Sequence, residues 1–231
     1  MILSRYDIER RAEDVLRGYM GGTVPDNSCR IDVDALARSL GLRVCRMRLS
    51  DDGTVLGVTT YVDTEVELKR YCRRETLRVP RNIVLLNESL YGTRAVPGRR
   101  RYTIAHECAH QILWRDEPNE RRRSLRTHSM RTASSYAGQD VQTERQADAM
   151  AAALLMPAVF VSRLTERFAR GRKLVSYGGR FNPPDKIALA NIGAALDVSH
   201  TALVIRLRRL GYLYDLPRDE YYVPTEVWPD E

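Results

Sequence analysis

The spacing of apolar residues divides the chain into a first part with mixed periodicities and a second part that is mainly helical. Residues 6–18 place apolar side chains at helical spacing, and residues 32–40 predict a second, shorter helix. Residues 42–49 alternate between apolar and basic side chains, whereas residues 55–62 and 83–86 are rich in β-branched or aliphatic residues. We therefore predict a strand in each of these last three segments.

Helical spacing dominates from Tyr102 almost to the end of the chain. Residues 102–114 and 140–156 predict two strong helices, and the polar, basic stretch over residues 115–139 predicts a loop between them. Further helices are expected after residue 159. The pattern therefore predicts an α+β fold with a small N-terminal sheet, a central pair of helices and a helical C-terminal portion.

The composition is that of an ordinary globular protein, because 43% of the 231 residues are hydrophobic and the mean hydropathy is −0.41. The longest apolar run, Ala149–Val161, covers thirteen residues and includes Pro157, so it is too short to span a bilayer. The N-terminus lacks the apolar core of a signal peptide, and the four cysteines contain no CxxC pair. We therefore expect a cytoplasmic protein with reduced thiols and no membrane partner.

The net charge of +7 is concentrated in one part of the sequence. Between Arg94 and Arg131 there are ten arginines against four acidic residues. Such a basic patch attracts nucleic acid or an acidic protein surface, but an arginine-rich loop exposed to solvent has the same composition. Both interpretations stay open at the level of the sequence.

The strongest chemical signal is an HExxH motif, His106–His110, within the predicted helix over residues 102–114. Residues four positions apart lie above one another on a helix, so His106 and His110 can both reach one Zn²⁺ ion. Glu107 then lies beside the metal, where its carboxylate can take a proton from water. The motif therefore predicts His106 and His110 as metal ligands and Glu107 as the catalytic residue.

A catalytic zinc site needs a third protein ligand, and the second predicted helix offers one. Glu144 and Asp148 are four residues apart, so both carboxylates share a face of that helix. Glu144 can bind the metal, and Asp148 can hydrogen-bond a ligand histidine from behind; the alternative is that both are solvated charges. The remaining histidines, His128 in the arginine-rich stretch and His200 near the C-terminus, are interpreted as a surface and a structural residue.

Three segments resemble the ImmA/IrrE family of bacterial zinc metallopeptidases. They are Arg101–His110, Glu144–Asp148 and Ala152–Pro157, and the resemblance covers roughly residues 5–160 with a weaker extension to about residue 213. It implies a zincin-like metallopeptidase core, in which a small sheet precedes the HExxH helix and a second helix carries a glutamate. Met150 stands where the family usually has an aromatic residue, which is a conservative change in packing.

The resemblance also implies a function. It assigns Zn²⁺ to His106, His110 and Glu144, and it makes Glu107 the general base and later the general acid. Members of the family typically cleave a partner helix-turn-helix repressor, so transcription regulation or a stress response is implied. The group that stabilises the oxyanion is left open between Tyr102, Tyr136 and an arginine.

A second interpretation belongs to another class of protein. Residues 187–212 have the outline of a helix-turn-helix with a turn at 197–199. The alternative is therefore a DNA-binding transcriptional regulator whose metal site is structural or inactive, although two packed helices with a basic end are also common in cores. Its DNA or partner contacts would be His200 and Thr201 to bases and Arg206, Arg208 and Arg209 to phosphates.

The same patterns suggest an organisation into three parts. Residues 1–160 are expected to form the metallopeptidase domain, and residues 161–213 a helical, helix-turn-helix-like subdomain. Residues 214–231 form an acidic, aromatic tail. This tail either packs along the body of the protein or lies across the basic patch or the cleft and restrains activity.

Overall fold

The computed structural model describes residues 3–22, 29–51, 55–70, 73–92, 98–114 and 139–221. The chain forms two compact units, with Met1–Asp26 and Ile31–Leu155 in unit 1 and Asn27–Arg30 and Met156–Glu231 in unit 2. The predicted mixed α+β fold is confirmed. The arginine-rich stretch after Trp114, which includes His128 and Tyr136, and the tail beyond Tyr221 lie outside the described residues.

The central sheet of unit 1 contains β1 (Arg43–Met47), β5 (Ile83–Asn87) and β2 (Gly57–Thr59), in that order. β1 runs parallel to β5, and β2 runs antiparallel to it at the edge of the sheet. Each of the three predicted strand segments therefore contains a strand. All residues of β5 are buried, as expected for a strand with neighbours on both sides.

A hairpin that the sequence pattern did not predict covers one face of this sheet. It consists of β3 (Thr64–Arg70) and β4 (Arg73–Val79), which pair antiparallel. Inward-facing residues of the hairpin join the sheet in one buried cluster, which includes Val66, Leu68 and Val79 as well as Val58 of β2. The alternating pattern thus places one side of the hairpin in the core.

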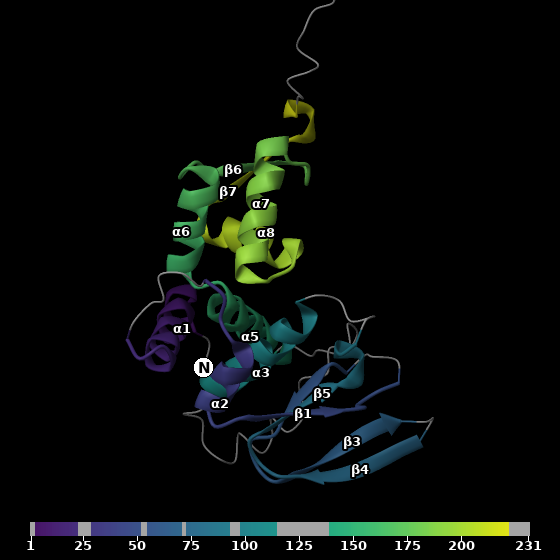
Figure 1. Ribbon diagram of the computed structural model, residues 1–231. Helices are drawn as coiled ribbons and strands as arrows, with labels where there is room; N and C mark the ends of the chain where they lie inside the picture. The colour runs from purple at the N-terminus through teal and green to yellow at the C-terminus, as the bar shows by residue number, and fades with distance from the viewer. Residues whose placement is uncertain are drawn as a thin grey trace, which may run out of the picture. The chain divides into compact units, whose positions relative to one another are not determined.

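The helices of unit 1 lie on the other side of the sheet (Figure 1). Their bounds are Arg5–Tyr19 for α1, Val33–Ser39 for α2, Arg99–Trp114 for α3 and Gln139–Leu155 for α5. α3 packs on β2 and β5, and α5 packs between α3 and α1. Several alanines of α3 and α5, among them Ala105, Ala109 and Ala151, are buried, and their small side chains allow packed helices to approach closely.

Unit 2 contains α6 (Ala158–Ala169), β6 (Leu174–Tyr177), α7 (Pro183–Leu196), α8 (His200–Leu210) and β7 (Leu213–Leu216). The helices α7 and α8 follow the predicted helix-turn-helix outline, with a bend of 102° between them. The chain turns at Asp197, which has a left-handed φ of 53°. The short parallel pair β6–β7 was not predicted.

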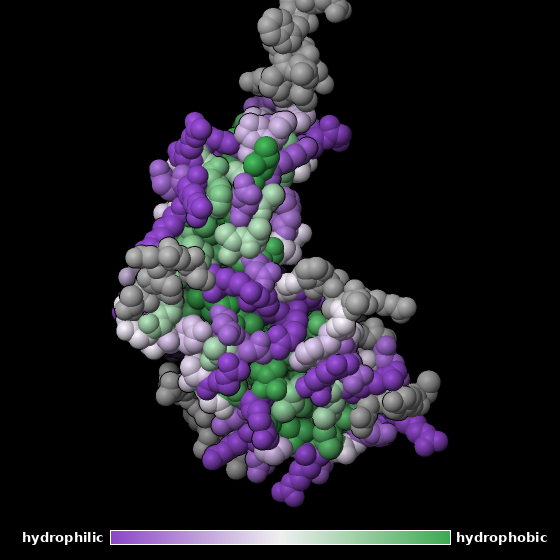
Figure 2. Space-filling model, viewed as in Figure 1, coloured by the Kyte–Doolittle hydropathy of each residue, from purple (hydrophilic) through white to green (hydrophobic). Residues whose placement is uncertain are grey.

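The surface seen in Figure 2 mixes hydrophilic and hydrophobic residues over the visible faces of both units. In the part of the chain that the structure describes, no single helix is long and apolar enough to cross a membrane, although two bent helix pairs reach that length and composition together.

Candidate metal centre

Two histidines of α3 approach each other in the interior of unit 1. His106 and His110 are one helical turn apart, and their Nε2 atoms are 3.0 Å from each other. Both side chains are buried. A neutral imidazole has one N–H and one lone pair, so two converging Nε2 atoms are well suited to share a cation.

Glu144 of α5 completes this cluster from the neighbouring helix. Its Oε2 lies 3.0 Å from Nε2 of His106, and its Oε1 lies 3.4 Å from Nε2 of His110. The ligand atoms of the three residues all lie within 4.8 Å of one another, so the group could hold a metal ion. The structure thus brings together the three predicted ligands from two helices.

Asp148 lies behind His106, as the spacing along α5 predicts. Its Oδ1 is 3.0 Å from Nδ1 of His106 and also accepts a hydrogen bond of 2.8 Å from the hydroxyl of Tyr102. An Nδ1–H that donates to this carboxylate leaves the lone pair of the imidazole on Nε2, directed at Glu144 and His110. This is the tautomer that a metal ligand needs.

Two buried polar atoms of the cluster lack a hydrogen bond among the described residues. They are Oε1 of Glu144 and Nδ1 of His110. A buried carboxylate oxygen without a donor is costly, and a cation beside it removes that cost. The donor set of two imidazoles and one carboxylate fits a divalent metal such as zinc.

The electrostatics of the cluster also favour a positive charge. Burial lowers the pKa of His106, but hydrogen bonds with Asp148 and Glu144 raise it, and the result is about 9. Burial raises the pKa of Glu144, but its polar interactions with His106 and His110 outweigh burial and hold this pKa at about 2. The carboxylates thus stabilise a cation between them, which is a proton on His106 or a metal ion in its place.

Glu107 faces a different neighbour, the edge strand β2. Its carboxylate is buried, and Oε2 accepts a hydrogen bond of 2.6 Å from Oγ1 of Thr59. The negative charge of Glu107 raises the pKa of the adjacent His106, so this carboxylate acts electrostatically on the cluster. Sequence reasoning missed Thr59, because its partner lies 48 positions away along the chain.

Aromatic rings line the site beyond His110. Trp114 lies 4.5 Å from the His110 ring, and Tyr61 contacts Trp114 edge-on at 5.5 Å between ring centroids. Burial raises the pKa of Tyr61, and the negative charges of Glu107 and Glu144 raise it further. The phenol of Tyr61 is therefore close enough to the cluster to interact electrostatically with both carboxylates. Tyr61 was not among the predicted oxyanion donors, whereas Tyr102, which was, is hydrogen-bonded to Asp148.

The predicted DNA-contact residues all lie in unit 2. His200 and Thr201 are exposed at the start of α8. Arg208 forms two hydrogen bonds of 2.6 Å with the carboxylate of Asp215. Arg206, interpreted from the sequence as a phosphate contact, is instead 1% exposed, and its Nε donates to the carbonyl oxygen of Met156. Arg209 is exposed.

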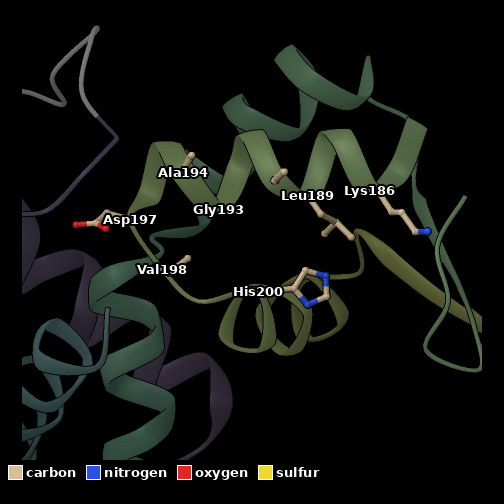
Figure 3. A pocket seen from close by; sticks show the side chains of 8 residues that line it. Lys186, Leu189, Gly193, Ala194, Asp197, Val198 and His200 are labelled. Carbon is tan, nitrogen blue, oxygen red and sulfur yellow. The ribbon is translucent and has the colours of Figure 1, made fainter. Parts of the chain in front are cut away.

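A separate pocket of about 360 Å³ lies between α7 and α8. Figure 3 shows Leu189 of α7 and His200 of α8 extending toward each other across it. Its floor is formed by small and apolar side chains, and Lys186 and Asp197 lie at its ends. Its lining includes none of the three candidate metal ligands, His106, His110 and Glu144.

Fold and site together define an α+β protein in which two packed helices carry a group of side chains that could hold a metal ion. The chain belongs to the peptidase M78 family, described as the IrrE N-terminal-like domain, whose family model matches residues 37–208. The match covers both α3 and α5 and confirms the resemblance found in the sequence. No curated protein matches the chain significantly.

Proposed function

We propose that the protein is a zinc-dependent endopeptidase with a zincin-like core, in which His106, His110 and Glu144 hold the metal. The observation that carries the proposal is the convergence of these three ligand atoms within 4.8 Å, with Asp148 directing Nε2 of His106 toward the others. Membership of a peptidase family points in the same direction. Zinc is the metal that this donor set most often binds.

The proposed reaction is hydrolysis of a peptide bond. Bound zinc supplies Lewis-acid chemistry, since it lowers the pKa of water and polarises a carbonyl group. The carboxylate of Glu107 accepts a proton from the attacking water and later gives it to the amine nitrogen as the C–N bond breaks. Asp148 and Tyr102 keep His106 in the tautomer that leaves its Nε2 lone pair free.

We infer further that the substrate is a regulatory protein, a helix-turn-helix transcription repressor in the cytoplasm. This inference rests on the resemblance to the ImmA/IrrE family. Residues 1–160 would be the catalytic domain, residues 161–213 the helical subdomain, and residues 214–231 the tail. DNA binding by α8 has less support, because Arg206 is buried and Arg208 is paired with Asp215.

Metal content and proteolysis together test this function. We expect about one zinc per chain, measured by mass spectrometry of the purified protein, and loss of that zinc in Glu144→Ala. The matched control is Glu166→Ala on α6, which alters a glutamate outside the cluster and should leave the zinc in place.

Proteolysis is tested by identifying new peptide N-termini in a lysate of the source cells. The wild-type protein should generate specific new termini that Glu107→Gln does not, while Glu107→Gln retains its zinc. A wild-type protein without stoichiometric metal, or one that generates the same termini as Glu107→Gln, contradicts the proposal.

A further inference from the structure

The edge strand β2 presents alternate residues to opposite sides of the sheet. Val58 belongs to the apolar cluster beneath the β3–β4 hairpin, whereas its neighbours Gly57 and Thr59 contact α3. The register is fixed by pairing with β5, where Gly57 lies opposite Leu86 and Thr59 opposite Val84. This alternation brings Gly57 and Thr59 to the same side chain, that of Glu107.

Thr59 and Gly57 contact the two oxygens of Glu107 in different ways. The hydroxyl of Thr59 donates to Oε2 at 2.6 Å. A Cβ atom at Gly57 would lie 2.8 Å from Oε1, and also 2.8 Å from Cγ2 of Thr103, so no larger residue fits without displacement. The Glu107 carboxylate therefore occupies the space left by the missing side chain of Gly57, and it accepts a hydrogen bond from Thr59.

A glutamate side chain has three rotatable bonds, so proximity to His106 in the sequence does not fix where its carboxylate lies. Proton transfer needs the carboxylate within hydrogen-bond distance of the reacting groups. A buried, charge-assisted hydrogen bond is strong enough to select one arrangement. The hydrogen bond from Thr59 of β2 can therefore determine where the Glu107 carboxylate lies.

We propose that Thr59 is a positioning residue for the peptidase reaction, whose hydroxyl fixes the Glu107 carboxylate in the space that Gly57 leaves free. This inference rests on the proposed function, because it assigns a purpose to Glu107. It goes beyond the HExxH motif, since Thr59 and Gly57 both belong to β2 and not to α3 or α5.

The test uses zinc-loaded full-length protein and acetohydroxamic acid, which chelates zinc through two oxygens and offers a proton to a neighbouring carboxylate. Its affinity reports where Glu107 lies, without a natural substrate. Thr59→Val keeps the shape of the side chain and the strand propensity but removes the donor. We expect Thr59→Val to bind the hydroxamate roughly tenfold more weakly, as for the loss of a hydrogen bond to a charged group, and Thr59→Ser to bind it like wild type.

Thr60→Val is the matched control on the adjacent residue. The hydroxyl of Thr60 donates to the carbonyl oxygen of Pro80 at 2.6 Å and accepts from the backbone N–H of Ile83, away from Glu107. Its loss should lower the melting temperature without changing hydroxamate affinity. Gly57→Ala is a second, independent variant, in which the added Cβ displaces Glu107 and weakens binding without touching the hydroxyl of Thr59.

The outcomes separate this inference from the proposed function. Wild-type affinity in Thr59→Val, while Glu107→Gln binds the hydroxamate more weakly, overturns the positioning role of Thr59. Equal affinity in Glu107→Gln and wild type, or failure of the wild type to hold zinc, overturns the proposed function instead. If Thr59→Val does not fold, unchanged affinity in Gly57→Ala overturns the inference. Once the lysate assay has identified a cleaved protein, its cleavage by Thr59→Val should show a lower kcat and an unchanged KM.

Discussion

Asp148 determines which nitrogen of His106 faces the other ligands. Because Oδ1 of Asp148 receives the Nδ1–H, replacement of this carboxylate frees the imidazole to rotate or change tautomer. We predict that Asp148→Ala lowers zinc affinity by roughly 10–100-fold, the usual effect of losing such a partner. Competition with a chromophoric chelator measures this change.

Tyr102→Phe serves as the graded control for Asp148→Ala. It removes the hydroxyl that donates to Oδ1 of Asp148 but keeps the carboxylate itself. Its effect on zinc affinity should be smaller than that of Asp148→Ala. Wild-type zinc affinity in Asp148→Ala would mean that His106 is oriented by packing alone.

At the scale of single residues, the sequence predicts which side chains share a helix face, but it does not predict contacts between side chains of different elements. The i, i+4 spacing of His106 and His110, and of Glu144 and Asp148, predicts shared helix faces, and the structure brings the four together. Thr59 approaches Glu107 only because β2 packs on α3. No local periodicity encodes that contact, so it could not be predicted from the sequence.

Among the elements, α2 and α3 are joined by an ion pair between Asp34 and Arg100. Arg100 of α3 donates to both carboxylate oxygens of Asp34 of α2, at 2.9 and 2.6 Å. These hydrogen bonds lower the pKa of Asp34 below its ordinary value of 3.8. A lowered pKa stabilises the folded state above pH 3.8, and that stability is lost as the pH falls through the lowered pKa.

Asp34→Asn tests this linkage. The variant should melt at a lower temperature than the wild type at pH 7, and the difference should shrink as the pH falls below the ordinary pKa of an aspartate. Thermal unfolding by circular dichroism across this range measures it. Asp14→Asn, which removes an exposed pair with Arg17, should change little at any pH. A difference for Asp34→Asn that is independent of pH contradicts the charge argument.

The buried Arg206 links α8 to Met156, which lies just before α6. Its Nε donates to the carbonyl oxygen of Met156, and its side chain is almost fully enclosed. We predict that Arg206→Ala lowers the free energy of unfolding by roughly 3 kcal/mol, through the lost hydrogen bond and the cavity. Denaturant titration measures this change, with Arg209→Ala, at an exposed position of the same helix, as the control. Equal stability of the two variants would contradict the assigned role.

Strong local periodicity made some elements predictable and left others hidden. α3 and α5 were predicted within a few residues, because long amphipathic or alanine-rich segments have few competing structures. The β3–β4 hairpin was missed because exposed charged residues at the start of β4, such as Arg73, Arg74 and Glu75, interrupt its apolar alternation. β6 and β7 are four residues each and pair across most of unit 2, so neither has a local signal.

At the scale of the whole molecule, the candidate metal ligands belong to one unit only. His106 and His110 lie on α3 and Glu144 lies on α5, so a bound metal crosslinks two helices of unit 1. A ligand that binds only the folded state stabilises it by about 2.7 kcal/mol at a free concentration 100 times its Kd. This stabilisation should be confined to unit 1, whose helices carry the ligands, unless the two units unfold together.

Hydrogen exchange with and without zinc therefore tests how the molecule divides. We predict slower amide exchange in α3 and α5 when zinc is added, and unchanged exchange in α7 and α8. Glu144→Ala, which lacks one ligand, should show no zinc-dependent change in either unit. Equal slowing in α7 and α8 would mean that the two units form one cooperative system, because stability gained at the metal would then reach elements that hold none of its ligands.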